Sequence, residues 1–200
     1  MKTKTLRSFA LLTVVALLSA CGTTAPTNFY TLSAETAEQA PPDEQKRVLV
    51  GIGPVEVAAY LERSQIVTRP GPTRLSLTEF NHWAEPVESN VAGVLATNLS
   101  RLLPSVHPIA RPWTDAEAEY HVLVKILRFD SDSAGNVQLI ANWGIQVHAT
   151  RSMPLIRDAA IKQASIGEDY EAITKNMSLA LAKLSEEIAL ELGKLTDSAR

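Results

Sequence analysis

Cysteine is almost absent from this chain: Cys21 is the only one in 200 residues. No disulfide can form within the chain, and a zinc site built from several thiolates is excluded. Long hydrophobic runs are also missing. The longest apolar stretch, residues 9–18, is about half of the roughly 20 residues that a membrane-spanning helix needs.

Motifs for catalysis are missing as well. There is no GxSxG nucleophile turn and no HExxH zinc motif, and the four histidines do not pair at metal-ligand spacing. His148 falls on the polar side of an alternating segment, which indicates a solvated side chain. The segment 51–54, Gly-Ile-Gly-Pro, has no following Lys-Ser/Thr and is not a phosphate loop. We therefore expect no enzyme, no metal and no cofactor.

A basic surplus is lacking too. The net charge is −3, and it becomes −6 once the three basic residues of the first 20 positions are removed. A nucleic-acid-binding protein would show a basic face. Electrostatic binding to anionic lipid headgroups needs clustered Lys and Arg side chains. The charge thus argues against both kinds of partner, and any membrane attachment has to come from a lipid.

The N-terminus has the layout of a bacterial lipoprotein leader. Lys2, Lys4 and Arg7 form a basic segment, and the apolar run 9–18 fits the 7–15 residues of a signal peptide. It ends in Leu-Ser-Ala directly before Cys21, which is the pattern of a lipobox. We predict a signal peptide over 1–20 and lipidation of Cys21. The alternative is an ordinary secretory signal with an incidental cysteine.

The residue after the cysteine is Gly22 rather than Asp. In enterobacteria-like sorting, Asp at that position favours retention in the inner membrane. We therefore expect outer-membrane localisation on the periplasmic face, with residues 21–28 as a lipidated tether.

Periodicity predicts one α/β or α+β domain over residues 29–195, with a mixed, partly antiparallel sheet and two main amphipathic helices. A frayed tail is expected over 196–200, after a helix cap at Gly193. Residues 33–47 and 104–116 read as loops, and Leu75 and Leu77 as half-buried strand positions. The expected strands are 29–32, 48–52, 64–69, 74–80, 122–126, 137–149 and 157–166, and the expected helices begin near residues 85 and 169.

Several segments together are similar to the ABC-transport auxiliary lipoprotein family. Their order and spacing carry the resemblance, which covers nearly the whole mature chain. They are residues 29–32 after the lipobox, 60–69, 75–86, 98–103 and 137–143. Val87 departs from the family pattern, where leucine follows the proline. The resemblance implies a three-layer α/β fold similar to the N-terminal domain of TolB.

The resemblance also implies a function. Such lipoproteins accompany mammalian-cell-entry (MCE) proteins of the PqiB type, which form hydrophobic conduits across the periplasm. It implies a homo-oligomeric ring that docks the end of an MCE conduit through which phospholipid moves. The alternative is an assembly or stability factor for another envelope complex.

Three residues that match the family pattern are candidate partner-interface residues, namely Arg63, Arg69 and Trp83. The family assigns them no catalytic role. For the two arginines a salt bridge is an equal alternative. For Trp83 the alternative is packing of the first helix onto the sheet.

Overall fold

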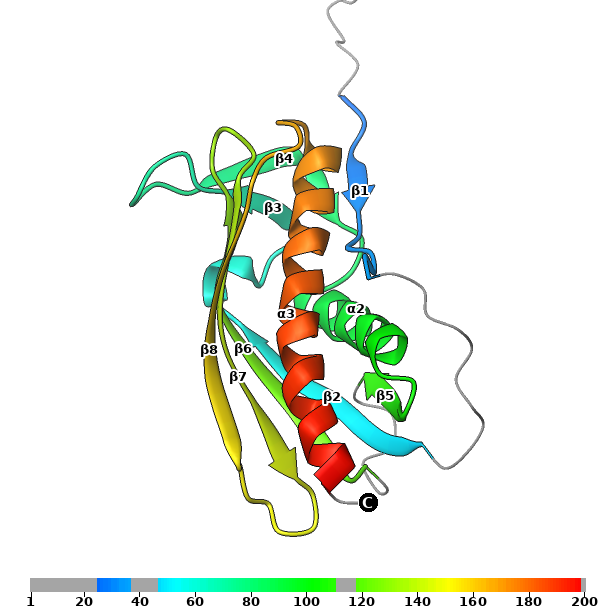
Figure 1. The fold of residues 1–200 in the computed structure, drawn as a ribbon. Coiled ribbons are helices and arrows are strands. Elements are labelled where there is room, and N and C mark those ends of the chain that lie inside the picture. Colours follow the sequence, from blue (N-terminus) through cyan, green and yellow to red (C-terminus); the bar gives the residue numbers. More distant parts are fainter. Residues whose placement is uncertain (1–24, 37–46, 111–117, 199–200) are drawn as a thin grey trace, which may run out of the picture.

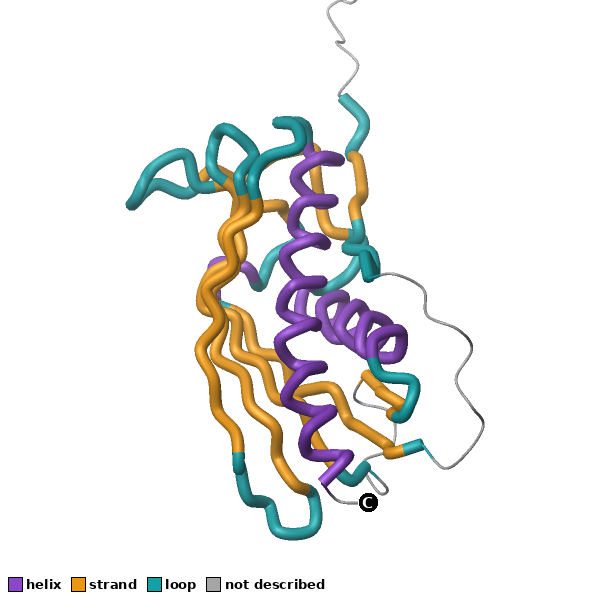
Figure 2. The backbone as a smooth tube through the Cα atoms, in the orientation of Figure 1, coloured by secondary structure: helices purple, strands orange, loops and turns teal. Residues whose placement is uncertain are grey.

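The structure, a computed structural model, describes residues 25–36, 47–110 and 118–198. The predicted signal peptide and Cys21 lie outside these residues. None of the helices in the described ranges is both long and apolar enough to cross a membrane. Figures 1 and 2 show one elongated body, with the first described residues, from residue 25, at one end and the C-terminus at the other.

Eight strands form a single mixed sheet (Figure 1). In chain order they are β1 (Asn28–Tyr30), β2 (Val48–Val57), β3 (Gln65–Thr68), β4 (Ser76–Trp83), β5 (Val106–Ala110), β6 (Tyr120–Ser131), β7 (Val137–Val147) and β8 (Leu155–Gln163). The sheet order is β1-β4-β3-β6-β2-β5, and β7 and β8 extend it from the other edge of β6. Strands β6, β7 and β8 form an antiparallel meander, whereas β2 lies parallel to both β5 and β6.

Two helices cover one face of this sheet. Helix α2 (Val87–Leu102) packs on β2 and β5, and helix α3 (Tyr170–Ser198) packs on β7 and β8. Because the helices also contact each other, both lie on the same face, which gives two layers where the resemblance implies three. The short 3-10 helix η1 (Ala59–Leu61) joins β2 to β3. The predicted α/β class, mixed sheet and two main helices are confirmed.

The periodicities explain the core. Alternate residues of β7 point to the helices and are buried: Val137, Leu139, Ala141, Trp143 and Ile145. The matching apolar stripe of α3 recurs every three or four residues, as an amphipathic helix requires: Ile173, Met177, Leu181, Leu184, Ile188 and Leu192.

Two strands that contain proline differ from the sequence prediction. Strand β2 was expected to end before Gly53-Pro54, but it continues to Val57, and its pairing with β6 shifts register between Ile52 and Val55. A local irregularity of this kind accommodates a residue without an N–H group. Strand β5 contains Pro108 and lies within the expected loop 104–116. It is an edge strand, where a missing donor is tolerated.

The C-terminal helix is longer than predicted. The expected cap at Gly193 is wrong, because α3 runs through it to Ser198 and Gly193 does not adopt a positive φ. Residues 196–198 of the expected frayed tail are therefore helical, and Thr196 is buried. Residues 199 and 200 lie outside the described residues.

Candidate functional site

The chain enters the fold at a sheet edge, directly after the predicted tether. Strand β1 pairs parallel with β4, with Asn28 opposite Asn81 and Tyr30 opposite Trp83. The Ala84 N–H donates to the Tyr30 carbonyl over 2.8 Å and closes the ladder. The first described strand is thus fixed to the strand that leads into α2.

After β1, residues 31–36 cross the helix pair; we call this segment the strap. Two asparagines of α2 hold it. The Leu32 N–H donates to Asn90 Oδ1 over 2.9 Å, and the Glu35 N–H and the Thr36 hydroxyl each donate to Asn98 Oδ1 over 3.2 Å. Asn90 and Asn98 are eight residues apart, about two helical turns, and so face the strap together.

Helix α3 holds the strap from its other side. The Ser33 N–H donates to Ser178 Oγ over 3.1 Å, and Asn98 Nδ2 donates to Ser185 Oγ over 3.1 Å. Asn98 and both of these serines are buried. Buried polar groups are costly unless they are paired, so this network favours one position of the strap on the helices.

An ion pair between Glu35 and Lys175 closes the strap at the surface. Burial alone would raise the pKa of the Glu35 carboxyl, but hydrogen bonds from Lys175 and Ser33 outweigh it and lower the pKa below its ordinary value of 4.5. Arg101 donates to the carbonyls of Ala34 and Thr36.

Arg63 and Trp83 meet at a pocket of about 440 Å³ where β3 and β4 lead into α2. Trp83 is a buried lining residue, and its backbone N–H donates to the Ser64 carbonyl over 2.6 Å. The Arg63 side chain is exposed and donates to the Tyr60 carbonyl over 2.9 Å. The remaining lining includes three acids, Glu62, Glu85 and Glu88.

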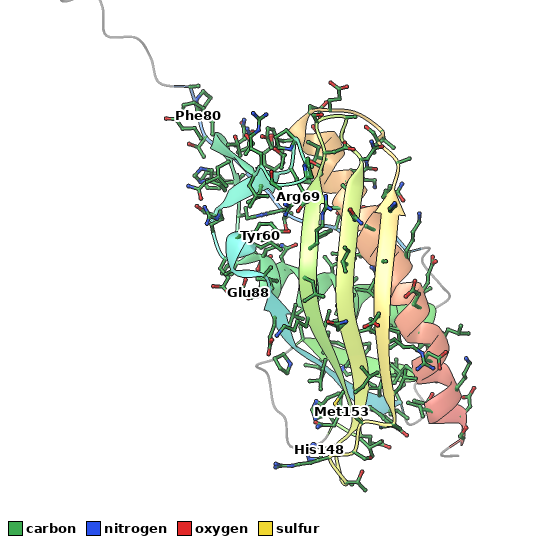
Figure 3. All side chains as sticks on the ribbon, turned by 90° about the vertical axis from the view of Figure 1, so that its left-hand side faces the viewer. Tyr60, Arg69, Phe80, Glu88, His148 and Met153 are labelled. Carbon is green, nitrogen blue, oxygen red and sulfur yellow. The ribbon has the colours of Figure 1, made fainter. Side chains whose placement is uncertain are left out.

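Arg69 lies in a different environment, beside the buried carboxylate of Asp130. Its Nε is 2.9 Å from Asp130 Oδ2, and Arg128 Nε is 2.9 Å from Oδ1. The Tyr60 hydroxyl donates to the same carboxylate over 2.8 Å, and Figure 3 shows Tyr60 and Arg69 close together. Burial raises the pKa of Tyr60, and the Asp130 carboxylate adds to this.

The three candidate residues therefore separate into two groups. Arg63 and Trp83 share a pocket, whereas Arg69 joins the end of β3 to β6 through Asp130. Cys21 lies outside the described residues. Sequence reasoning missed Asn90 and Asn98. A signal for them existed: both are polar residues on the apolar side of the predicted helix.

One histidine differs from its expected setting. His148 is exposed, but its Nδ1 lies 3.1 Å from Nε2 of the buried His121. Within residues 25–36, 47–110 and 118–198, no group of three His, Cys, Asp or Glu side chains could hold a metal ion.

The family follows from a sequence comparison. The model of the ABC-type transport auxiliary lipoprotein component matches residues 30–189, which is most of the chain. The chain belongs to this family. Membership makes it an auxiliary component of a transport system and implies lipid-anchored attachment in the cell envelope. A search of curated proteins finds no match.

Two solved structures have the same fold as this chain. One, described as an uncharacterized protein, aligns with a TM-score of 0.71 at 19% identity, covering 84% of this chain and 99% of the other. The protein XCC0632 from Xanthomonas campestris aligns with a TM-score of 0.68 at 17% identity, covering 86% and 100%. A PelC dodecamer from Paraburkholderia phytofirmans reaches only 0.41 at 10% identity, covering 81% and 94%, and carries no argument about assembly.

Proposed function

We propose that this family member is an outer-membrane-anchored periplasmic lipoprotein that docks an MCE-domain conduit of an intermembrane phospholipid transport system. The observation that carries the proposal is the strap, which ties the segment next to the tether to both helices. Cys21 and Asn28 are seven positions apart in the chain, so the tether reaches at most about 25 Å. A lipid on Cys21 would therefore hold the folded domain close to the membrane.

The docking role is structural, with no catalytic step assigned. Arg and Trp are the residue types that most often dominate binding at protein interfaces. The pocket is lined by the exposed Arg63 and the buried Trp83, together with three glutamates. We propose this pocket as the contact with the MCE protein. Arg69 supports it indirectly by fixing β3 to β6.

We further propose that several copies form a homo-oligomeric ring. The end of a tubular conduit has rotational symmetry, and a ring of identical subunits can match it with one repeated contact. In such a ring each copy would present the same pocket.

The test is affinity capture of the lipidated protein from its own envelope, with mass spectrometry of what co-purifies. We expect an MCE-domain protein to be recovered with the wild type and to be depleted with Arg63→Glu. Arg157→Glu is the matched control, because Arg157 is also exposed and also donates to a backbone carbonyl. It should leave recovery unchanged.

Two other outcomes separate the parts of the proposal. Full recovery with Arg63→Glu would place the docking contact elsewhere on the domain. Absence of any MCE protein, with the lipoprotein confirmed in the outer membrane, would contradict docking and favour an assembly or stability role in another envelope complex.

A further inference from the structure

The end of the domain from which the tether leaves exposes apolar side chains. Phe29 in β1 is 67% exposed, Ile166 in the loop before α3 is 58% exposed, and Leu77 in β4 is 50% exposed. Leu75, just before β4, is also exposed. Single exposed apolar residues are ordinary, but a group of them on one surface indicates an interaction site.

These residues come from three segments that are far apart in sequence but share one end of the molecule. Figure 1 places β1, β4 and the loop before α3 at the end of the molecule opposite the C-terminus. Phe29 and Ile166 line one open groove between β1 and α3. Figure 3 places Phe80 of β4 at this end of the molecule, whereas His148 and Met153 lie at the far end.

We propose that this end, through Phe29, Leu75, Leu77 and Ile166, contacts the surface of the lipid bilayer as a second membrane attachment. The inference rests on the lipidation proposed for Cys21. The short tether keeps this end near the bilayer, so the contact forms at a high effective concentration and can be weak on its own.

The charge of this end selects the kind of lipid. Four acidic side chains lie in the β6–β7 turn and around the start of α3: Asp132, Glu168, Asp169 and Glu171. The basic side chains at this end are fewer and do not cluster, because Arg74 lies in the β3–β4 turn, Lys162 lies on β8 and Lys175 is paired with Glu35. Attraction to anionic headgroups needs clustered basic residues. We therefore propose an apolar contact with a zwitterionic lipid surface. The strength of this contact should depend little on salt concentration.

The test uses the lipidated full-length protein in phosphatidylcholine vesicles that contain lipid with a nitroxide on the headgroup. Cys21 is blocked by lipid, so an engineered cysteine provides a unique thiol for a fluorescent probe. Ser76→Cys places the probe at the start of β4, and Ser152→Cys places it in the β7–β8 turn at the opposite end. We expect the nitroxide to quench the probe at position 76 strongly and the probe at position 152 little.

Matched pairs of substitutions identify the side chains responsible. Phe29→Gln with Leu77→Gln should abolish most of the quenching at position 76. Leu127→Gln with Ile156→Gln should leave it unchanged, although these side chains are comparably exposed, at 44% and 63%. Equal quenching at positions 76 and 152, or quenching that persists after the first pair, overturns the proposal.

Two controls distinguish this proposal from its premise. Flotation of the wild type with the vesicles reports the lipid on Cys21. Failure to float overturns the anchor and this contact together, whereas flotation without selective quenching overturns the contact alone. A blue shift of the probe at position 76 without quenching would mean that another protein surface covers this end, and it would also overturn the proposal.

Discussion

The two sides of α3 are held by different kinds of interaction. Toward the core, its apolar stripe includes Leu181, Leu184 and Ile188, all fully buried. Toward α2 and the strap, Ser178 and Ser185 accept hydrogen bonds from the Ser33 amide and from Asn98. Apolar burial is non-directional and supplies most of the stability, whereas a buried hydrogen-bond network fixes position. The sheet side thus stabilises the domain, and the strap side determines where the tethered segment sits.

The largest effect should come from the apolar side. Leu184→Ala removes a fully buried side chain and should lower the free energy of unfolding by about 2–5 kcal/mol. Leu190→Ala, on the exposed side of the same helix, should change it by less than about 0.5 kcal/mol. Urea unfolding of both variants measures this contrast. Equal losses would mean that the helix does not owe its stability to the buried stripe.

The next largest effect tests a charged contact within the apolar layer. Asp130→Asn leaves Arg69 and Arg128 without their buried counter-charge and should cost about 3 kcal/mol of unfolding free energy. Asp158→Asn, at an exposed carboxylate that accepts a hydrogen bond from Asn142, is the control and should cost much less. A similar cost for the two would contradict a structural role for the Arg69 pair.

A smaller effect is expected on the strap side. Asn98→Ala removes the acceptor of the Glu35 amide and the donor to Ser185 Oγ, and it should cost about 1–3 kcal/mol of unfolding free energy. Hydrogen exchange of the strap amides should accelerate selectively, while the amides of β7 keep their protection relative to global unfolding. Ser100→Ala, on the exposed side of α2, should change neither. Uniform acceleration throughout the domain would argue against a separate strap.

The smallest effect is a pH dependence at the strap surface. Because the folded-state pKa of Glu35 is lowered, the Glu35–Lys175 pair stabilises the domain above pH 4.5, and the contribution is lost as the pH falls through the folded-state pKa. Its size should stay below about 1 kcal/mol. The difference in unfolding free energy between wild type and Glu35→Gln, measured against pH, should shrink in acid. A constant difference would exclude ionisation of Glu35 as its source.

Sequence reasoning succeeded where buried apolar residues recur at a regular spacing. The alternation along residues 137–147 predicted β7, and the helical spacing of apolar residues predicted α2 and α3. It failed at β5, where Pro108 sits in a short edge strand, because nothing local distinguishes such a strand from a loop. It also placed Leu75 and Leu77 in a half-buried strand, although both are exposed, because alternation does not show whether a face is covered.

The candidate site was predictable only in part. Arg63 and Trp83 could be named as candidates from their segments, but their shared pocket depends on how β3 pairs with β4. The partner of Arg69 is 61 residues further along the chain, and only the sheet order brings Asp130 beside it. The roles of Asn90 and Asn98 depend on the strap, whose path over the helices no local pattern specifies.

The strap has a consequence for the order of folding. It lies in the first part of the chain that the structure describes, yet the Ser33 amide donates to Ser178, which is 145 residues later. Contacts over such separations form late, because a long loop must close first. The strap therefore stays open until α3 has folded, so its amides should gain protection from hydrogen exchange later than those of the β6–β7 hairpin.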